Sequence, residues 1–340
     1  MSSFKKITLL GGSGFVGSQL TIDLARHCDN VTVLTRRKQR FRELKVLSNV
    51  HVQKCNVHDA EELTAALQGS DVVVNLVGIL NQSKDSDDNS FTAAHAELTQ
   101  KVVTAVKETG VAHYLHMSSL GADAEDGSSE YLRSKGEAER HVQQILASAA
   151  VEQQSACAAT IFRPSVIFGE SDSFFNRFAG LLRIMHVFPL ACPDSRLSPV
   201  YVEDVSNAMV AALGLKPNDT GGGDFELHSS DQGFGLRSVE LCGPKDYSLR
   251  ELVQFTADTM GIKRKIVGLP DWAAQLQGRV LGVLPAAPFS TDNYQSLQTD
   301  SVCQDEKCRQ PTSIETVVPR YLGNTGKRSD QQRHRALARR

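Results

Sequence analysis

Short apolar segments alternate with amphipathic ones along the first half of the chain. The apolar segments are mostly rich in β-branched residues, as buried parallel strands are. They lie at Ile7–Leu10, Val31–Leu34, Val50–Gln53, Val72–Val77, Tyr114–Met117 and Ala159–Phe162. Helical patterns occupy most of the intervals, at Val16–Arg26, Asp59–Leu67, Phe91–Thr109 and Tyr131–Ala150. This alternation predicts stacked βαβ units and an α/β fold built on a doubly wound parallel sheet.

The second half loses this alternation and predicts a smaller, mostly helical region. Its helical patterns lie at Asp172–Met185, Val202–Leu213, Leu249–Met260, Asp271–Leu284 and Thr291–Leu297. The glycine-rich stretch at 218–237 predicts a loop or insertion, and the polar, basic stretch after residue 322 predicts a disordered tail. We therefore expect a nucleotide-binding domain at 1–165, a substrate or lid region interleaved with it at 166–322, and a tail at 323–340.

Composition narrows the class of protein. Of 340 residues, 41% are hydrophobic and 22% charged, which is ordinary for a globular protein and excludes wholesale disorder. A formal net charge of −2 gives no bulk attraction to nucleic acid. We expect no signal peptide and no transmembrane helix, because the N-terminus leads directly into a strand and no apolar run is long enough. Seven scattered cysteines, an odd number, suggest reduced thiols and a cytoplasmic location.

A glycine-rich loop follows the first predicted strand and precedes the first predicted helix. Gly11 would permit the tight turn, Gly14 a close approach of backbone to a pyrophosphate, and Gly17 close packing of helix on strand. The helix N-terminus would direct free N–H groups at the phosphates. In this position the motif predicts a Rossmann-type dinucleotide site. The other loop residues expected at the cofactor are Ser13, Phe15 and Val16.

The end of the second strand indicates which dinucleotide is bound. Sites for NAD(H) usually place a carboxylate there to hold the ribose 2′-OH. This chain has Thr35 followed by Arg36, and a guanidinium favours a 2′-phosphate through charge-assisted hydrogen bonds. We therefore expect NADP(H) rather than NAD(H), with Arg36 at the 2′-phosphate.

Tyr131 and Lys135 form a Tyr-x-x-x-Lys pair on one face of a predicted helix. A nearby ammonium favours the phenolate, so the pair suits acid/base transfer to a substrate oxygen. Ser119 ends the preceding strand segment, where its hydroxyl would polarise the same oxygen. A Tyr-x-x-x-Lys pair alone often occurs by chance. When it follows a phosphate loop and a strand that ends in Ser-Ser, it is a specific signal for this chemistry.

Together these motifs resemble the short-chain dehydrogenase/reductase superfamily, in its extended or atypical, epimerase/dehydratase-like branch. Three further segments carry the resemblance. They are Asn75–Gly78, Phe162–Gly169 and Pro199–Val205. Within the branch, the chain is most similar to the NADPH-binding accessory subunit of respiratory complex I and its bacterial relatives, over about residues 5–322.

The resemblance implies positions around the cofactor that the residues alone do not give. It places Lys135 on the nicotinamide ribose and Tyr131 beside the reactive ring. Asn56 stands where many relatives carry an Asp at the adenine. The other cofactor-lining positions that it implies are Asn75, Val77, Gly78, Pro164 and Ser165. The mammalian complex I subunit resembles a reductase whose active-site Ser is replaced, whereas this chain keeps Ser119.

Three functions are compatible with these features. The first is a complex I accessory-subunit-like protein that binds NADP(H) and serves respiratory or quinone metabolism, docked on a membrane complex at the inner face of the inner membrane. The second is an active carbonyl reductase or epimerase-like oxidoreductase, as the family's relatives in ubiquinone biosynthesis suggest. The third is a nucleotide sensor or scaffold, against which the intact Tyr131 and Lys135 argue. The 272–289 segment fits either a membrane-facing patch or a packed lid helix, and a packed or surface position is the simpler expectation for His95.

Overall fold

The predicted strands of the first half join one sheet in the computed structural model. Eight strands lie in the order β11-β12-β6-β5-β4-β1-β2-β3, and every neighbouring pair is parallel except β11 with β12. Their bounds are β1 Ile7–Leu10, β2 Val31–Thr35, β3 Val50–Lys54, β4 Val72–Asn75, β5 His113–Met117, β6 Ala158–Pro164, β11 Ser230–Gly233 and β12 Leu236–Leu241. The strand order reverses between β1 and β4, so the predicted doubly wound sheet is confirmed, with its topological switch point beside β1.

The structure describes residues 4–36, 47–82, 90–151, 157–217, 227–233, 235–281 and 289–323. Two compact units divide the chain. The sheet unit comprises Met1–Pro164, Val202–Leu241 and Asp305–Cys308, and the second unit comprises Ser165–Tyr201, Cys242–Gln304 and Arg309–Arg340. Most of the glycine-rich stretch, at 218–226, and the predicted tail beyond residue 323 lie outside the described residues.

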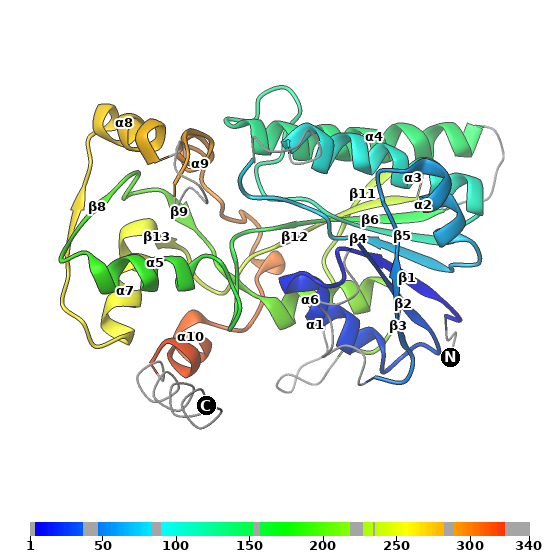
Figure 1. Cartoon of the computed structure of the whole chain (residues 1–340), viewed down its shortest axis with the longest axis horizontal. Helices are drawn as coiled ribbons and strands as arrows, with labels where there is room; N and C mark the ends of the chain where they lie inside the picture. The colour runs from blue at the N-terminus through cyan, green and yellow to red at the C-terminus, as the bar shows by residue number, and fades with distance from the viewer. Residues whose placement is uncertain are drawn as a thin grey trace, which may run out of the picture. The chain divides into compact units, whose positions relative to one another are not determined.

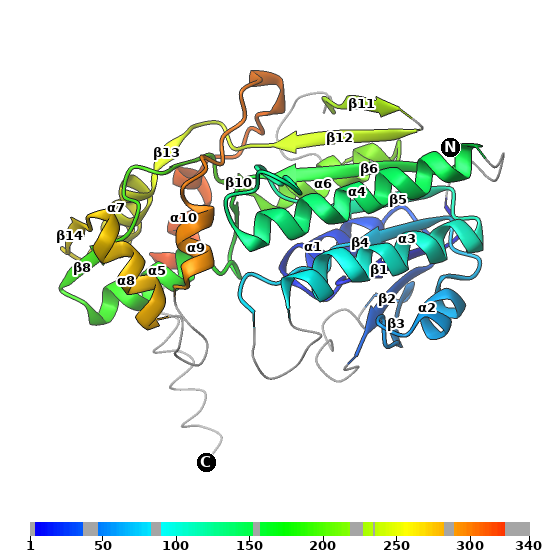
Figure 2. The same ribbon diagram turned by 90° about the horizontal axis from the view of Figure 1, so that it is seen from above.

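Helices cover both faces of the sheet (Figure 1). One face carries α1 Phe15–Leu24 and α6 Val202–Ala212, and the other carries α2 Ala60–Leu67, α3 Leu98–Thr109 and α4 Glu130–Val151. Figure 2 shows α2, α3 and α4 side by side along their face. The side chains between these three helices and the strands are mostly aliphatic and buried, as burial on both faces of a parallel sheet requires. On the opposite face, Ser206 Oγ donates to the buried Asp23 carboxylate at 2.6 Å and joins α6 to α1.

The expectation that 218–237 is a loop or insertion is wrong at its end. β11 and the start of β12 lie in this range, and β12 pairs with β6 along its whole length. β11 reads Ser-Asp-Gln-Gly, is exposed throughout and lies at the sheet edge. Its pairing with β12 therefore needs no apolar pattern, and the sequence offered none.

The second unit is mostly helical, with short strand pairs between the helices. Its helices are α5 Phe175–Ile184, α7 Leu249–Thr259, α8 Asp271–Leu281, α9 Thr291–Ser296 and α10 Ile314–Leu322. Its strands are β7 Ile167–Phe168 with β10 Val200–Tyr201, β9 Arg196–Leu197 with β13 Tyr247–Ser248, and β8 Val187–Leu190 with β14 Lys265–Gly268. Phenylalanine and aliphatic side chains from α5, α7 and α10 fill its core.

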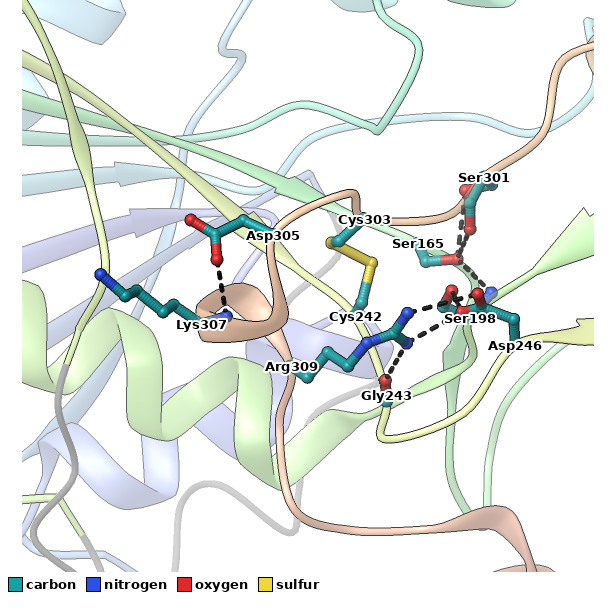
Figure 3. Close-up of a disulfide and its surroundings, with 10 residues drawn as sticks. All are labelled: Ser165, Ser198, Cys242, Gly243, Asp246, Ser301, Cys303, Asp305, Lys307 and Arg309. Atoms are coloured by element: carbon teal, nitrogen blue, oxygen red, sulfur yellow. Dashed lines mark hydrogen bonds and ion pairs between the residues drawn. A yellow bond between two sulfur atoms is a disulfide. The ribbon is translucent and has the colours of Figure 1, made fainter.

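Two of the cysteines expected to be reduced form a disulfide. Cys242 and Cys303, 61 residues apart in sequence, have Cα atoms 6.0 Å apart (Figure 3). Near the bridge, Arg309 Nη1 donates to Asp246 Oδ1 at 2.8 Å. The other five cysteines are free thiols. The sequence could not indicate this pair, because only the fold brings the end of β12 beside the segment after residue 300.

Candidate active site

The glycine loop after β1 has the geometry that a pyrophosphate requires. Gly11 has a φ of +75°, in the left-handed region that favours glycine. A Cβ on Gly17 would lie 2.2 Å from the Gly11 carbonyl oxygen, so the loop and α1 approach too closely for any side chain there. Gly14 is the N-cap of α1 and supplies no side-chain hydrogen bond to the helix. The open N–H groups of α1 therefore fit an anionic ligand, and Ser13, Phe15 and Val16 lie in the same turn.

The segment after β4 lies against this loop. A Cβ on Gly11 would be 2.9 Å from the carbonyl carbon of Leu76, and Leu76 N donates to Leu10 O. The Asn75 side chain is buried, and its Oδ1 accepts a hydrogen bond from Val77 N at 3.1 Å. Asn75 thus shapes the turn that carries Val77 and Gly78 past the phosphate loop, and the cofactor role expected of all three residues stays a prediction.

Arg36 and Asn56 follow the carboxyl ends of β2 and β3, which are neighbours in the sheet. Both side chains are exposed. Asn56 Oδ1 accepts from His58 N at 3.3 Å, and its amide nitrogen can still donate. Because the carboxyl ends of parallel strands share one edge, Arg36 and Asn56 lie at the same edge as the glycine loop.

Lys135 is buried on α4, and its ammonium faces the carboxyl end of β5. Its side chain reaches inward so that Nζ donates to Met117 O at 2.9 Å, and the residue is only 4% exposed. A Cβ on Gly78 would lie 3.2 Å from this ammonium. Burial lowers the pKa of Lys135 to about 8, while Glu139 opposes the shift. Glu139 itself is bonded to Arg163, so it does not neutralise Lys135 alone.

Tyr131 lies one turn before Lys135 and contacts two rings from the other side of the site. Its ring centroid is 5.7 Å from that of Phe91 and 5.4 Å from that of His95, both edge to face. Ser129 begins the helix, and its Oγ accepts from Leu132 N at 3.1 Å. The predicted Tyr-x-x-x-Lys pair is therefore brought together with the Gly78 segment.

The strand end carries two serines, and they differ in environment. Ser119 is partly exposed, and its Oγ donates to Leu120 O at 3.2 Å. Ser118 is buried, and its Oγ has no hydrogen-bond partner among the described residues. A buried hydroxyl without a partner costs free energy unless a ligand supplies one. Ser118 is thus a further candidate for the site. The sequence showed two adjacent serines at this strand end, but the prediction assigned the role to Ser119 alone.

Two uncharged histidines lie near Lys135. Burial, reinforced by the charge of Lys135, lowers the pKa of His116 to about 3 and that of His95 to about 2. Tyr114 and His116 share a hydrogen bond of 3.2 Å, and His116 Nε2 has no partner among the described residues. The surroundings of Lys135 therefore favour a ligand that offers hydroxyl groups or negative charge.

Pro164 and Ser165 are adjacent in sequence but belong to different units. Pro164 ends β6 in the sheet unit and is buried, and its carbonyl accepts from Leu120 N at 3.0 Å. Ser165 belongs to the second unit, where its Oγ donates to Ser301 O at 2.6 Å and accepts from Ser198 N at 3.2 Å. These bonds use the Ser165 hydroxyl within its own unit (Figure 3).

Known proteins share sequence similarity with most of this chain. The NAD dependent epimerase/dehydratase family matches residues 7–227. Subunit 9 of the NADH dehydrogenase [ubiquinone] 1 alpha subcomplex from Arabidopsis thaliana is 28% identical over 88% of this chain and 71% of its own length. A ceramide reductase from Caulobacter vibrioides is 24% identical over 78% of this chain and 74% of its own.

Solved structures show the same fold at low sequence identity. An NADPH-dependent quinone oxidoreductase from Escherichia coli superimposes with a TM-score of 0.63 at 16% identity, over 89% of this chain and 93% of its own. UDP-glucose 4-epimerase from Thermotoga maritima gives a TM-score of 0.60 at 15% identity, over 78% and 85%. With its glycine loop, its Tyr131 and Lys135 pair and a match over most of its length, the chain belongs to the NAD-dependent epimerase/dehydratase family.

Proposed function

We propose that this protein binds NADP(H) at the carboxyl edge of β1, β2 and β4 and serves respiratory or quinone metabolism as a complex I accessory-subunit-like protein. One observation carries the proposal: the phosphate loop, the Gly78 segment and the buried Lys135 converge at the sheet's switch point. In this arrangement Lys135 would hold the nicotinamide ribose, and the N-terminus of α1 the pyrophosphate.

The choice of NADP(H) over NAD(H) rests on Arg36. Its exposed guanidinium follows β2, and no carboxylate stands at the neighbouring Thr35 to repel a 2′-phosphate. The quinone oxidoreductase of similar fold was solved with NADPH, whereas a UDP-glucuronic acid 4-epimerase and a UDP-glucose 4-epimerase were solved with NAD. The residue at the end of β2, rather than the fold, therefore supports the proposal.

Replacing Arg36 by Ala is expected to weaken NADPH binding about tenfold or more and to leave NADH binding within about twofold. The lost charge-assisted hydrogen bond is worth roughly 1.5–3 kcal/mol, and only NADPH has the phosphate that uses it. Calorimetric titration with both nucleotides measures this. Arg26→Ala, an exposed arginine at the far end of α1, is the matched control. Equal loss for both nucleotides would contradict the assignment.

Docking on a membrane or membrane complex is supported by the exposed face of α8. The helix packs through Ala274 and Gly278, where a Cβ on Gly278 would be 3.2 Å from Thr291 Cα. Trp272 and Leu276, one turn apart on another face, are 71% and 53% exposed. The described part of α8 is thus a packed helix with an apolar outer face, and we propose that this face meets the membrane; residues 282–288 lie outside the described part.

Basic side chains precede this face, since Lys263 and Lys265 are exposed just before α8. Apolar groups beside cations suit the surface of an anionic bilayer. No helix in the described part of the chain is long and apolar enough to cross a membrane. We propose that the protein lies peripherally on the inner face of the inner membrane, with the exposed face of α8 toward the lipid.

The full chain is expected to cosediment with vesicles containing phosphatidylglycerol and much less with pure phosphatidylcholine. The double variant Trp272→Ser, Leu276→Ser should lower the bound fraction severalfold, because it removes the exposed apolar contacts. Ile22→Ser, an exposed apolar residue on α1, is the control and should bind as wild type. Equal sedimentation of the wild type and the double variant would contradict a role for α8.

A second candidate, catalysis, is favoured by the retained Ser118–Ser119, Tyr131 and Lys135 set. When bound, NADPH would supply a hydride to a carbonyl carbon. Tyr131 would donate its phenolic proton to the carbonyl oxygen, while a serine hydroxyl donates a hydrogen bond to that oxygen. Lys135 would stabilise the phenolate that results, and a proton from solvent would restore the phenol. The product is an alcohol, and the substrate gains one hydride and one proton.

Tyr131→Phe is expected to lower NADPH oxidation with quinones about a hundredfold or more while leaving NADPH affinity unchanged, because it removes only the transferable proton. Nicotinamide absorbance measures turnover, and calorimetry measures binding. Tyr247→Phe, in the second unit, should behave as wild type. Turnover by Tyr131→Phe at the wild-type rate would contradict the catalytic candidate.

A further inference from the structure

His95 occupies an irregular turn of the helix that faces Tyr131. It lies in the π-helical stretch Thr92–Glu97, directly before α3, and is 1% exposed. Single π-helical turns within helices are frequent at functional sites, where they re-aim one side chain. Here the turn directs the imidazole between the segment after β4 and helix α4, as its two hydrogen bonds show.

These hydrogen bonds determine the tautomer of His95. Ile79 N donates to His95 Nε2 at 3.0 Å, so Nε2 carries no proton. Nδ1 then carries the proton and lies 2.8 Å from Ser134 Oγ. The Ser134 hydroxyl donates its own proton to Tyr131 O at 2.8 Å, and so its oxygen accepts from His95. One arrangement of protons thus satisfies the hydrogen-bonding groups of Ile79 N, His95, Ser134 Oγ and Tyr131 O, and in it the imidazole is neutral.

The imidazole also packs directly against the rings of Tyr131 and Phe91. Its ring lies edge to face with Tyr131, at 5.4 Å and 85°, and stacks on Phe91 at 5.7 Å and 23°. A Cβ on Gly78 would be 3.5 Å from His95 Nε2 and 3.2 Å from Lys135 Nζ. His95 and Lys135 therefore lie over the same backbone position, and a charged imidazole there would repel the ammonium.

We propose that His95 is a positioning residue that fixes Tyr131 and the Gly78–Ile79 backbone relative to each other, and so sets where the nicotinamide ring lies. His95 acts through Ser134 and Tyr131 and transfers no proton itself. The inference rests on the proposed NADP(H) site. It goes beyond that site because it assigns a role to a residue that none of the nucleotide motifs contains.

The tautomer can be tested without any cofactor. In ¹⁵N NMR of the full chain, His95, assigned by its absence in His95→Gln, should show a protonated Nδ1 and a bare Nε2. This pattern should hold from pH 5 to pH 8, because burial and Lys135 keep the pKa of His95 far below this range. A proton on Nε2, or titration within this range, would overturn the proposed hydrogen-bond chain.

The positioning role can be tested with NADPH as the probe. Calorimetry reports affinity, which the phosphate loop and Arg36 dominate, and NADPH fluorescence reports the surroundings of the nicotinamide ring. His95→Phe and Ser134→Ala should keep NADPH affinity within about threefold but change the emission of the bound nicotinamide. His95→Gln, whose amide can accept from Ile79 and donate to Ser134, should restore the wild-type emission.

Ser148→Ala is the matched control for Ser134→Ala. Ser148 lies on the same helix and makes the same kind of bond, from Oγ to Ile145 O at 2.8 Å, but it is exposed. It should leave the emission unchanged. Unaltered emission in folded Ser134→Ala, with NADPH bound, would overturn the inference. Failure of the wild type to bind NADPH would instead overturn the proposed function, so the two outcomes are distinct.

Discussion

A buried ammonium is the constraint on which this site depends. Lys135 places its charge at the carboxyl end of β5, where its ammonium donates a hydrogen bond to Met117 O, and burial lowers its pKa to about 8. The unfolded chain binds this proton more tightly than the folded one, so folding is opposed below pH 8 and the opposition fades between pH 8 and 10.5. Functional sites commonly retain such a cost because the charge is used by a ligand.

The residues around Lys135 follow from that charge. At Gly78 the backbone runs beside the ammonium, and a Cβ there would lie 3.2 Å from Nζ, which is a tight contact. His95 and His116 stay neutral because burial disfavours the charged imidazolium, and the charge of Lys135 adds repulsion. The proposed nucleotide binding and the candidate catalysis would therefore depend on one geometry, which a binding subunit and a reductase would share.

Sequence patterns predicted the strands and helices of the first half because each has a clear apolar period and a glycine, serine or strand end at its boundary. They also identified the glycine loop, Tyr131 and Lys135, whose chemistry requires fixed spacing. They did not predict β11, which is polar and paired only at an edge, or the bridge between Cys242 and Cys303. Nor could spacing show that His95 meets Ser134, since that contact exists only once the π-helical stretch Thr92–Glu97 packs against α4.

The most direct test of this account is the pKa of Lys135 itself. Lysines labelled with ¹³C at Cε can be followed by NMR across the alkaline range, and the Lys135 resonance is assigned by its absence in Lys135→Met. The account predicts a midpoint near 8 in the folded protein without nucleotide. A midpoint near 10.5, the ordinary value for lysine, would show an ammonium in contact with water and would contradict the buried charge from which the site is built.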